Sequence, residues 1–115
     1  MTNKVEEFRR RREAGNEAAL ENGTLLTKRF FNLDSRCYEA RALDRKTKEL
    51  LGLAASLVLR CDDCITYHLT RAVEEGATRK ELAEVLDVAL VVGGSITIPH
   101  LRRAHEVVAE LIPSG

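Results

Sequence analysis

The chain has 115 residues, the size of one domain. Apolar residues make up 44% of it, but only 4% are aromatic and two are proline, so the composition favours amphipathic helices over a β-sandwich or barrel. Its 18 basic and 18 acidic residues leave no net charge, which argues against a nucleic-acid-binding protein.

Neither a transmembrane segment nor a signal peptide is expected. No apolar run is long enough to cross a membrane, and the charged stretch from Met1 to Arg12 lacks the apolar part of a signal peptide. We therefore expect a cytoplasmic protein with no membrane partner. In such a reducing compartment, three cysteines do not indicate a disulfide scaffold, and a close pair is more often catalytic or metal-binding.

The first predicted helix is short of apolar residues. Thr2 or Asn3 is a suitable N-cap, and Gly23 would end the helix after Asn22. The arginine run at 9–12 alternates with glutamates at helical spacing. We interpret this run as a solvated face and not as a phosphate or nucleic-acid site.

A second apolar segment begins at Thr24, and the turn-forming residues 32–35 are expected to interrupt it. A short helix from Arg36 to Leu43 would follow. Cys37 in that helix has no second cysteine or histidine within a few residues. We interpret it as a small buried apolar residue.

The next predicted helix runs from Arg45 to about Leu59, with Asp44 as its N-cap. It is apolar nearly all round, so it should be central and buried. Glu49 lies in its first half. The sequence leaves two alternatives for this carboxylate: it reaches solvent, or it is held inside for a purpose.

Residues 60–68, with the sequence RCDDCITYH, combine two cysteines with a histidine. The pattern predicts a helix that continues to about Gly76. On that helix, Cys61, Cys64 and His68 fall at i, i+3 and i+7, so the two sulfurs and the imidazole share one face. A dithiol with a neighbouring base is typical of redox chemistry.

A thiol reacts as its thiolate, which a helix N-terminus and an imidazole both stabilise. After one cysteine has been oxidised to the sulfenic acid, the other can close a disulfide. Asp62 and Asp63 oppose this, because negative charge beside the sulfurs should raise the pKa of the thiols. That effect is avoided if the carboxylates point to solvent or pair with Arg60.

Two more helices are predicted after the motif. Thr78-Arg79-Lys80-Glu81 is a capping box that opens the first of them. Gly93-Gly94 either ends this helix or lets another helix approach closely, and the apolar pattern on both sides favours close packing. The last helix begins at Ser95 or Thr97 and ends near Leu111.

The last helix carries two histidines, His100 and His105, five residues apart. That spacing does not suit two ligands of one metal ion, and we interpret both as surface or interface residues. His100 is the better candidate for a place at the site. Glycine-rich phosphate loops, paired catalytic carboxylates and nucleophile elbows are missing from the sequence, so we expect no cofactor.

The order Glu49, eleven residues, Cys61-x-x-Cys64, three residues, His68 is a specific pattern. With the glycine-terminated helix, the capping box and the Gly-Gly helix after it, this part of the chain resembles the AhpD-like branch of the carboxymuconolactone decarboxylase family. The resemblance covers about residues 43–109.

That resemblance implies an all-α fold of about six or seven helices and assembly into trimers or hexamers. We describe the chain as a single domain, 1–115, with an N-terminal helical extension at 1–42 and a core at 43–112. The implied activity is the thiol-dependent reduction of hydroperoxides. The implied electron donor is a dithiol protein, either lipoyl-bearing or thioredoxin-like.

The resemblance also implies a role for each residue of the motif. Cys64 would be the peroxidatic thiol and Cys61 the resolving thiol, with Glu49 and His68 as a proton relay. The i, i+4 spacing of Cys64 and His68 agrees independently with this. Tyr67 is, beside His100, a further candidate for an accessory role.

Two other functions remain open from the residues. In the first, Cys61, Cys64 and His68 bind zinc with Glu49 or His100 as the fourth ligand, although a second closely spaced ligand pair is missing. In the second, the cysteines are structural and the chain is a plain oligomeric helical module. A decarboxylase is less favoured, because nothing in the sequence suggests a pocket for a lactone acid.

Overall fold

The structure is a computed structural model that describes residues 3–113, and within this range it contains helices and no strand, which confirms the predicted all-α class. The elements are α1 (Lys4–Asn22), α2 (Leu25–Cys37), α3 (Arg45–Val58), α4 (Asp62–Glu74), α5 (Arg79–Gly93), the 3₁₀ turn η1 (Ser95–Thr97) and α6 (Ile98–Leu111).

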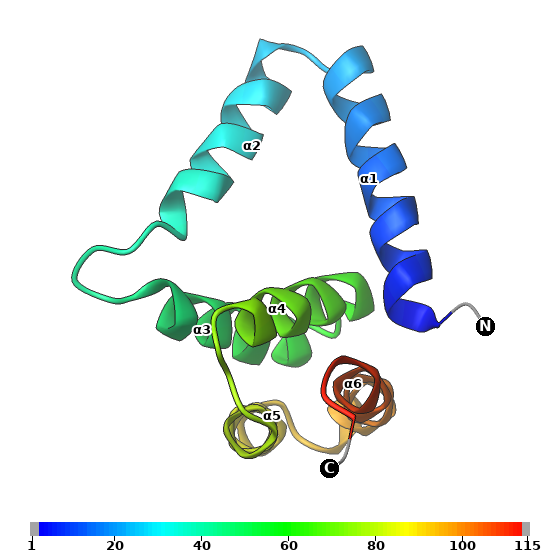
Figure 1. Cartoon of the computed structure of the whole chain (residues 1–115), viewed down its shortest axis with the longest axis vertical. Coiled ribbons are helices and arrows are strands. Elements are labelled where there is room, and N and C mark those ends of the chain that lie inside the picture. Colours follow the sequence, from blue (N-terminus) through cyan, green and yellow to red (C-terminus); the bar gives the residue numbers. More distant parts are fainter. Residues whose placement is uncertain (1–2, 114–115) are drawn as a thin grey trace.

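Helices α3 and α4 lie side by side at the centre, with α5 and α6 on one side of them and with α1 and α2 arching over the other (Figure 1). The core is formed where α3, α4, α5 and α6 turn apolar residues inward at i, i+4 spacing. These pairs are Leu53 and Leu57, Ile65 and Leu69, Leu82 and Leu86, and Ala104 and Val108. Residues 3–113 contain no helix long and apolar enough to cross a membrane.

The predicted helix starts are confirmed by their capping bonds. The side chain of Asn3 accepts the N–H of Glu6 at 2.8 Å, and that of Asp44 accepts the N–H of Thr47 at 2.7 Å. Both bonds of the capping box that opens α5 are present. Thr2, the alternative first cap, lies outside the described residues.

The predicted interruption of the second segment is wrong, because α2 continues through residues 32–35 to Cys37. Helix propensity is a weak preference, and the apolar spacing of Leu26, Phe30 and Leu33 continues across the turn-forming residues. The predicted helix 36–43 is therefore also wrong, and most of that range is the loop between α2 and α3.

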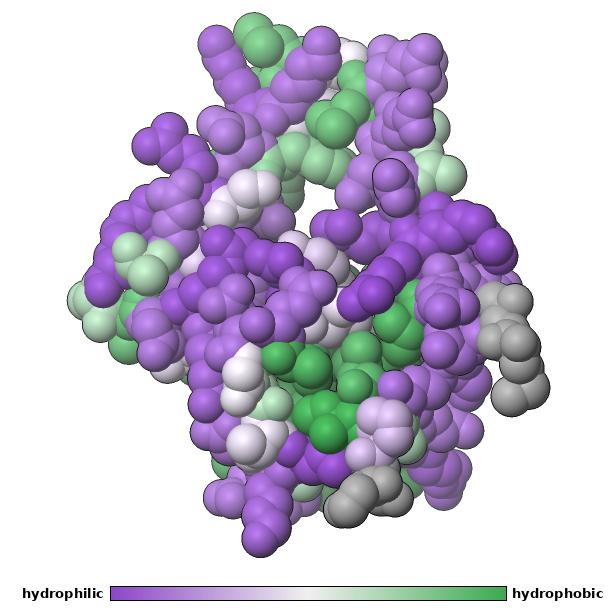
Figure 2. Space-filling view, viewed as in Figure 1, coloured by the Kyte–Doolittle hydropathy of each residue, from purple (hydrophilic) through white to green (hydrophobic). Residues whose placement is uncertain are grey.

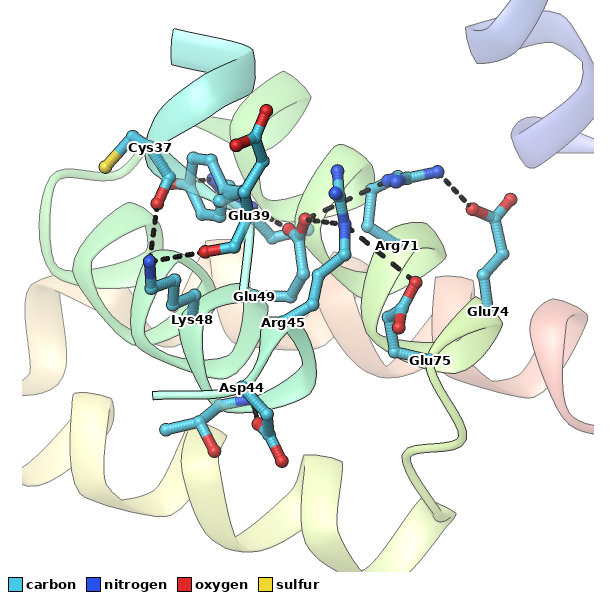
Figure 3. Close-up of polar contacts among 12 residues, drawn as sticks. Cys37, Glu39, Asp44, Arg45, Lys48, Glu49, Arg71, Glu74 and Glu75 are labelled. Carbon is cyan, nitrogen blue, oxygen red and sulfur yellow. Dashed lines mark hydrogen bonds and ion pairs between the residues drawn. The ribbon is translucent and has the colours of Figure 1, made fainter. Parts of the chain in front are cut away.

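A lysine of α3 holds the C-terminal end of α2 in place. Nζ of Lys48 donates hydrogen bonds to the carbonyls of Cys37, at 2.8 Å, and Glu39, at 2.7 Å (Figure 3). A cation that caps the last carbonyls stabilises a helix C-terminus. The loop after Cys37 is thus tied to the helix that carries Glu49.

Helix α2 buries none of its residues in this chain. Leu26 is 74% exposed and Phe30 is 66% exposed. The expectation that Cys37 is buried is wrong for the same reason, since it lies on this helix and is exposed. The expectation for α3 holds only in part, because Leu53 and Leu57 are buried whereas Leu51 is exposed.

The two alternatives for the glycine pair both apply. Helix α5 ends at Gly93, and Gly94 turns the chain with a φ of 83°. A side chain at Gly93 would clash with Thr97 and touch the backbone of Val58 at 3.6 Å. The first glycine therefore lets η1 and the end of α3 pack against α5.

Candidate functional site

The two motif cysteines lie at the start of α4. Cys61 is the N-cap, and its sulfur accepts the N–H of Cys64 at 3.3 Å. The two sulfurs are at disulfide-bonding distance, with Cα atoms 5.3 Å apart. Arg60, with a φ of 61°, turns the chain from α3 into this cap. Cys64 is exposed and Cys61 is half-buried, so Cys64 is the more accessible of the two residues.

Glu49 is fully buried, which decides between the two alternatives that the sequence left open. Its Oε1 lies 2.9 Å from Nδ1 of His68, at hydrogen-bonding distance. His68 is itself largely buried. Glu49 and His68, to which the family resemblance assigns a proton relay, are therefore one connected pair that reaches from α3 to α4.

Gly52 makes room for this histidine. It lies one turn after Glu49 on α3, and a Cβ built on it would be 2.6 Å from Cε1 of His68 and 2.8 Å from Nε2. Real Cβ atoms do not approach other atoms so closely, so a side chain here would displace the imidazole. Gly52 was not predicted to belong to the site, and its only signal in the sequence is that of a lone glycine inside an otherwise apolar helix.

Tyr38 reaches the other side of the imidazole. Its Oη is 3.5 Å from Nε2 of His68, and the two ring centroids are 5.4 Å apart. Burial raises the pKa of the Tyr38 phenol, and the charge of Glu49 adds to this effect. Tyr38 was also missed, because it lies in a loop that only the folded chain brings to the site.

A cavity of about 410 Å³ has Cys64 and His68 in its wall. Helix α4 contributes Asp63, Cys64, Tyr67 and His68, and the remaining walls come from α1 and α2. Arg11 and Arg12 of α1 are exposed, as a solvated face should be, yet they also line this cavity. The guanidinium of Arg12 stacks over the ring of Tyr67, 4.0 Å from its centroid.

The two aspartates between the cysteines, Asp62 and Asp63, lie in different surroundings. Asp62 contacts α6, where His100 lies 2.8 Å away through Nδ1 and Arg103 donates from Nε at 2.9 Å. The expected alternative, a pair with Arg60, is absent from the ion pairs of residues 3–113. Asp63 is exposed. His105 is exposed on α6 and lies apart from this cluster, as predicted for a surface histidine.

The proposed zinc ligands do not form a metal site within the described part of the chain. There, no group of three or more histidine, cysteine, aspartate or glutamate side chains is arranged to hold a metal ion. Cys61 and Cys64 are bonded to each other, Nδ1 of His68 faces Glu49, and His100 faces Asp62. The geometry favours dithiol chemistry over zinc binding.

The chain is similar to known proteins along most of its length. A sequence model of the carboxymuconolactone decarboxylase family matches residues 24–106. A curated protein from Paracoccus denitrificans, uncharacterized protein 4 in cox locus, is 30% identical over 77% of this chain and 80% of its own length. An uncharacterized protein from Cupriavidus necator is 40% identical, but the match covers only 46% of this chain and 47% of that protein.

Solved structures show the same fold. A carboxymuconolactone decarboxylase family protein from Thermotoga maritima, for which a possible role in the antioxidative response is stated, is 62% identical, with a TM-score of 0.88 over 91% of this chain and 89% of that chain. A family protein from Legionella pneumophila, solved in the apo form, is 28% identical, with a TM-score of 0.86 over 96% and 98%.

Proposed function

The chain belongs to the carboxymuconolactone decarboxylase family, and from that premise we propose that it is a thiol-dependent peroxidase that reduces hydroperoxides through Cys61 and Cys64. One observation carries the proposal. The exposed Cys64 and His68 line the same cavity, and Nδ1 of His68 lies at hydrogen-bonding distance from the buried Glu49. A nucleophile beside a base that a third group orients is the usual arrangement of an activated thiol.

In the first step, His68 takes the proton of Cys64, and the thiolate attacks one oxygen of the hydroperoxide. The O–O bond breaks, Cys64 becomes the sulfenic acid, and the leaving alkoxide takes the proton from His68 to depart as the alcohol. Glu49 stabilises the imidazolium that exists between the two proton transfers.

In the second step, the Cys61 thiol attacks the sulfenic sulfur. The S–S bond forms and the hydroxyl group leaves as water, so two electrons have passed from the dithiol to the peroxide. The position of Cys61 as the N-cap, in contact with the N–H of Cys64, supports this resolving role. A dithiol protein, lipoyl-bearing or thioredoxin-like, would restore both thiols by thiol–disulfide exchange. Such reductants are typical of a reducing cytoplasm.

The protein would act as a homo-oligomer, a trimer or a hexamer. A folded monomer of 12.8 kDa exposes roughly 6,300 Å² of surface, whereas this chain exposes 7557 Å². The excess agrees with the opening between α1 and α2 and with the apolar surface where these helices meet (Figure 2). Apolar side chains exposed on a helix that buries none of its own residues support association with further copies.

The experiment follows the thiols directly. The protein is reduced in a Cys37→Ser background, freed of reductant, and mixed with one equivalent of cumene hydroperoxide, and intact mass is recorded with thiol labelling over time. We expect loss of both thiols as the Cys61–Cys64 disulfide. Cys61→Ser should stop at a sulfenic acid on Cys64, and Cys64→Ser should stay reduced.

Cys37 provides the reference rate, because it is an exposed cysteine with no histidine among the residues that line the cavity beside it. In a variant that keeps Cys37 but carries serine at 61 and 64, the same peroxide should react slowly. Oxidation of the motif thiols no faster than Cys37 would contradict the peroxidase proposal.

A further inference from the structure

The second carboxylate oxygen of Glu49 has its own surroundings. Oε1 faces His68, while Oε2 is buried and makes no hydrogen bond within the described residues. The Glu49 side chain is only 1% exposed. A carboxylate withdrawn from water to this extent takes up a proton unless positive charge lies close to it.

Two guanidinium groups supply that charge (Figure 3). Nε of Arg45, from the previous turn of α3, is 3.9 Å from Oε2, and Nε of Arg71, from α4, is 3.8 Å from it. Both Nε atoms are buried and, within residues 3–113, have no hydrogen-bond partner. Oε2 of Glu49 therefore faces the two buried Nε atoms, and within residues 3–113 none of the three atoms forms a hydrogen bond.

The other carboxylates near these arginines compete only weakly. Arg71 donates from Nη1 to Glu74 at 2.7 Å, and Nε of Arg45 is 3.9 Å from Glu75. Glu74 and Glu75 are 45% and 33% exposed, so water screens their charge, whereas Glu49 has no such screening. The bond to Glu74 holds the Arg71 guanidinium with its Nε toward Glu49.

The charge of Glu49 decides what Nε2 of His68 can do. An ionised Glu49 accepts the Nδ1–H of the imidazole, which leaves a free lone pair on Nε2. If the buried pair takes up one more proton, Glu49 becomes a neutral acid facing the Nε2–H tautomer, or His68 becomes the imidazolium. Nε2 is protonated in both states and can no longer act as a base.

We propose that Arg45 and Arg71 are positioning residues that keep Glu49 ionised, so that Nε2 of His68 is available to accept a proton. Both act through Glu49 and lie outside the set of residues that line the cavity. Two tyrosines also face this ring: Oη of Tyr38 is 3.5 Å from Nε2, and the ring centroid of Tyr67 is 5.3 Å from that of His68. The raised pKa of Tyr38 keeps its phenol neutral. The consequence for peroxide reduction rests on the proposed function, but the protonation of the pair does not.

The test uses ¹⁵N NMR of the His68 ring in the full chain, in its disulfide form so that no motif thiol titrates. At pH 7 we expect Nδ1 protonated and Nε2 unprotonated in the unchanged protein. In Arg45→Gln/Arg71→Gln, Nε2 should be protonated at pH 7 and should lose that proton only at higher pH. Each single variant should show a smaller change in the same direction.

Two further variants separate charge from structure. Arg71→Lys keeps a positive charge and should restore the unprotonated Nε2, whereas a purely structural role would give no such rescue. Arg9→Gln removes an arginine that contacts Glu74 at 3.6 Å but not Glu49, and it should leave the ring unchanged. An Nε2 that stays unprotonated in the double variant would overturn the inference, and so would equal effects of Arg71→Lys and Arg71→Gln.

Kinetics then connect the pair to Cys64. In the reduced protein at pH 7, the double glutamine variant should oxidise with cumene hydroperoxide about tenfold more slowly, with the rate recovering as pH rises. If the unchanged protein does not react with peroxide but the NMR result is as expected, the peroxidase proposal fails and the inference on Glu49 stands. If the unchanged protein reacts with peroxide but the His68 ring is the same in the double glutamine variant, the inference on Glu49 fails and the peroxidase proposal stands.

Discussion

Oδ1 of Asp62 lies 2.8 Å from Nδ1 of His100, so the carboxylate that follows Cys61 in the sequence is held by α6. Arg103 holds the other oxygen of the same carboxylate at 2.9 Å. The acidic residue that argued against a reactive thiol therefore has a cation beside it. The negative charge of Asp62 is thus balanced by side chains of α6, about forty residues later in the chain.

Arg103→Gln should make Cys64 less reactive, because the Asp62 charge beside the motif would no longer be balanced. A partly exposed ion pair contributes about 0.2–1 kcal/mol, so the rate of peroxide oxidation should fall by a factor of about 1.4 to 5. Adding Asp62→Asn should restore the rate. Arg102→Gln, at an exposed neighbouring position, is the matched control. A rate that does not change in Arg103→Gln would show that this charge has no influence on the thiols.

Gly52→Ala should displace the imidazole of His68, since the new Cβ would lie 2.6 Å from Cε1. Overpacking a well-filled interior costs about 1–3 kcal/mol, and the bond between His68 and Glu49 should break. We expect a lower melting temperature and a rate of Cys64 oxidation at least about tenfold slower, in line with the loss of a positioned base.

Gly15→Ala is the stability control for that substitution. Gly15 also lies inside a helix, but apart from its chain neighbours and the backbone of its own helix no atom is within 4 Å of its Cβ position. Because alanine is the better helix former, this variant should be more stable by about 0.5–1 kcal/mol. The melting temperatures of both variants are measured by thermal unfolding, with circular dichroism as the signal. Similar behaviour of the two variants would contradict the account given for Gly52.

The sequence was most informative where a local rule decides the structure. The helix starts at Asp44 and Thr78 follow from side chains that bond backbone groups three residues away. The motif could likewise be placed from its spacing, because Cys61, Cys64 and His68 belong to one stretch of chain. Glu49 could be singled out by its apolar neighbours and by its spacing from the motif, but its burial depends on the packing of α3 against α4.

The parts that could not be predicted are those in which distant segments meet. Tyr38 reaches His68 from thirty residues away, and Arg103 reaches Asp62 from forty-one. Neither pair has a sequence pattern. Helix α2 differs from expectation for another reason: its apolar spacing is typical of a buried face, but within residues 3–113 none of its residues is buried.

The folded protein should lose stability in acid partly through Asp44 and Glu81. A hydrogen bond from Thr47 lowers the pKa of Asp44, and the bond to Lys46, 2.8 Å long, lowers the pKa of Glu81. A carboxyl whose pKa is lowered on folding stabilises the protein above its unfolded pKa, and this stabilisation is lost as the pH falls through the folded value. The relevant window lies below about pH 4.5.

Asp44→Asn keeps an N-cap but removes the titration, and Glu81→Gln removes the charge that pairs with Lys46. Urea unfolding from pH 7 down to pH 2.5 should show a shallower acid dependence for each variant. Asp87→Asn, at an exposed site on α5, is the matched control and should follow the unchanged protein. Parallel pH curves for all four proteins would contradict the assignment.

Phe30→Glu should dissociate the proposed oligomer. Phe30 is 66% exposed on α2, and burying such a side chain is worth about 1.5–3 kcal/mol, roughly a tenfold or greater change in each association constant. A buried carboxylate would add its own desolvation cost. Sedimentation velocity should show a trimer or hexamer for the unchanged protein and a smaller species for the variant, with the helical circular dichroism retained. Lys28→Glu places the same side chain on another face of α2 and should leave assembly intact. A chain that is already monomeric at tens of micromolar would show that the apolar row on α2 serves something other than self-association.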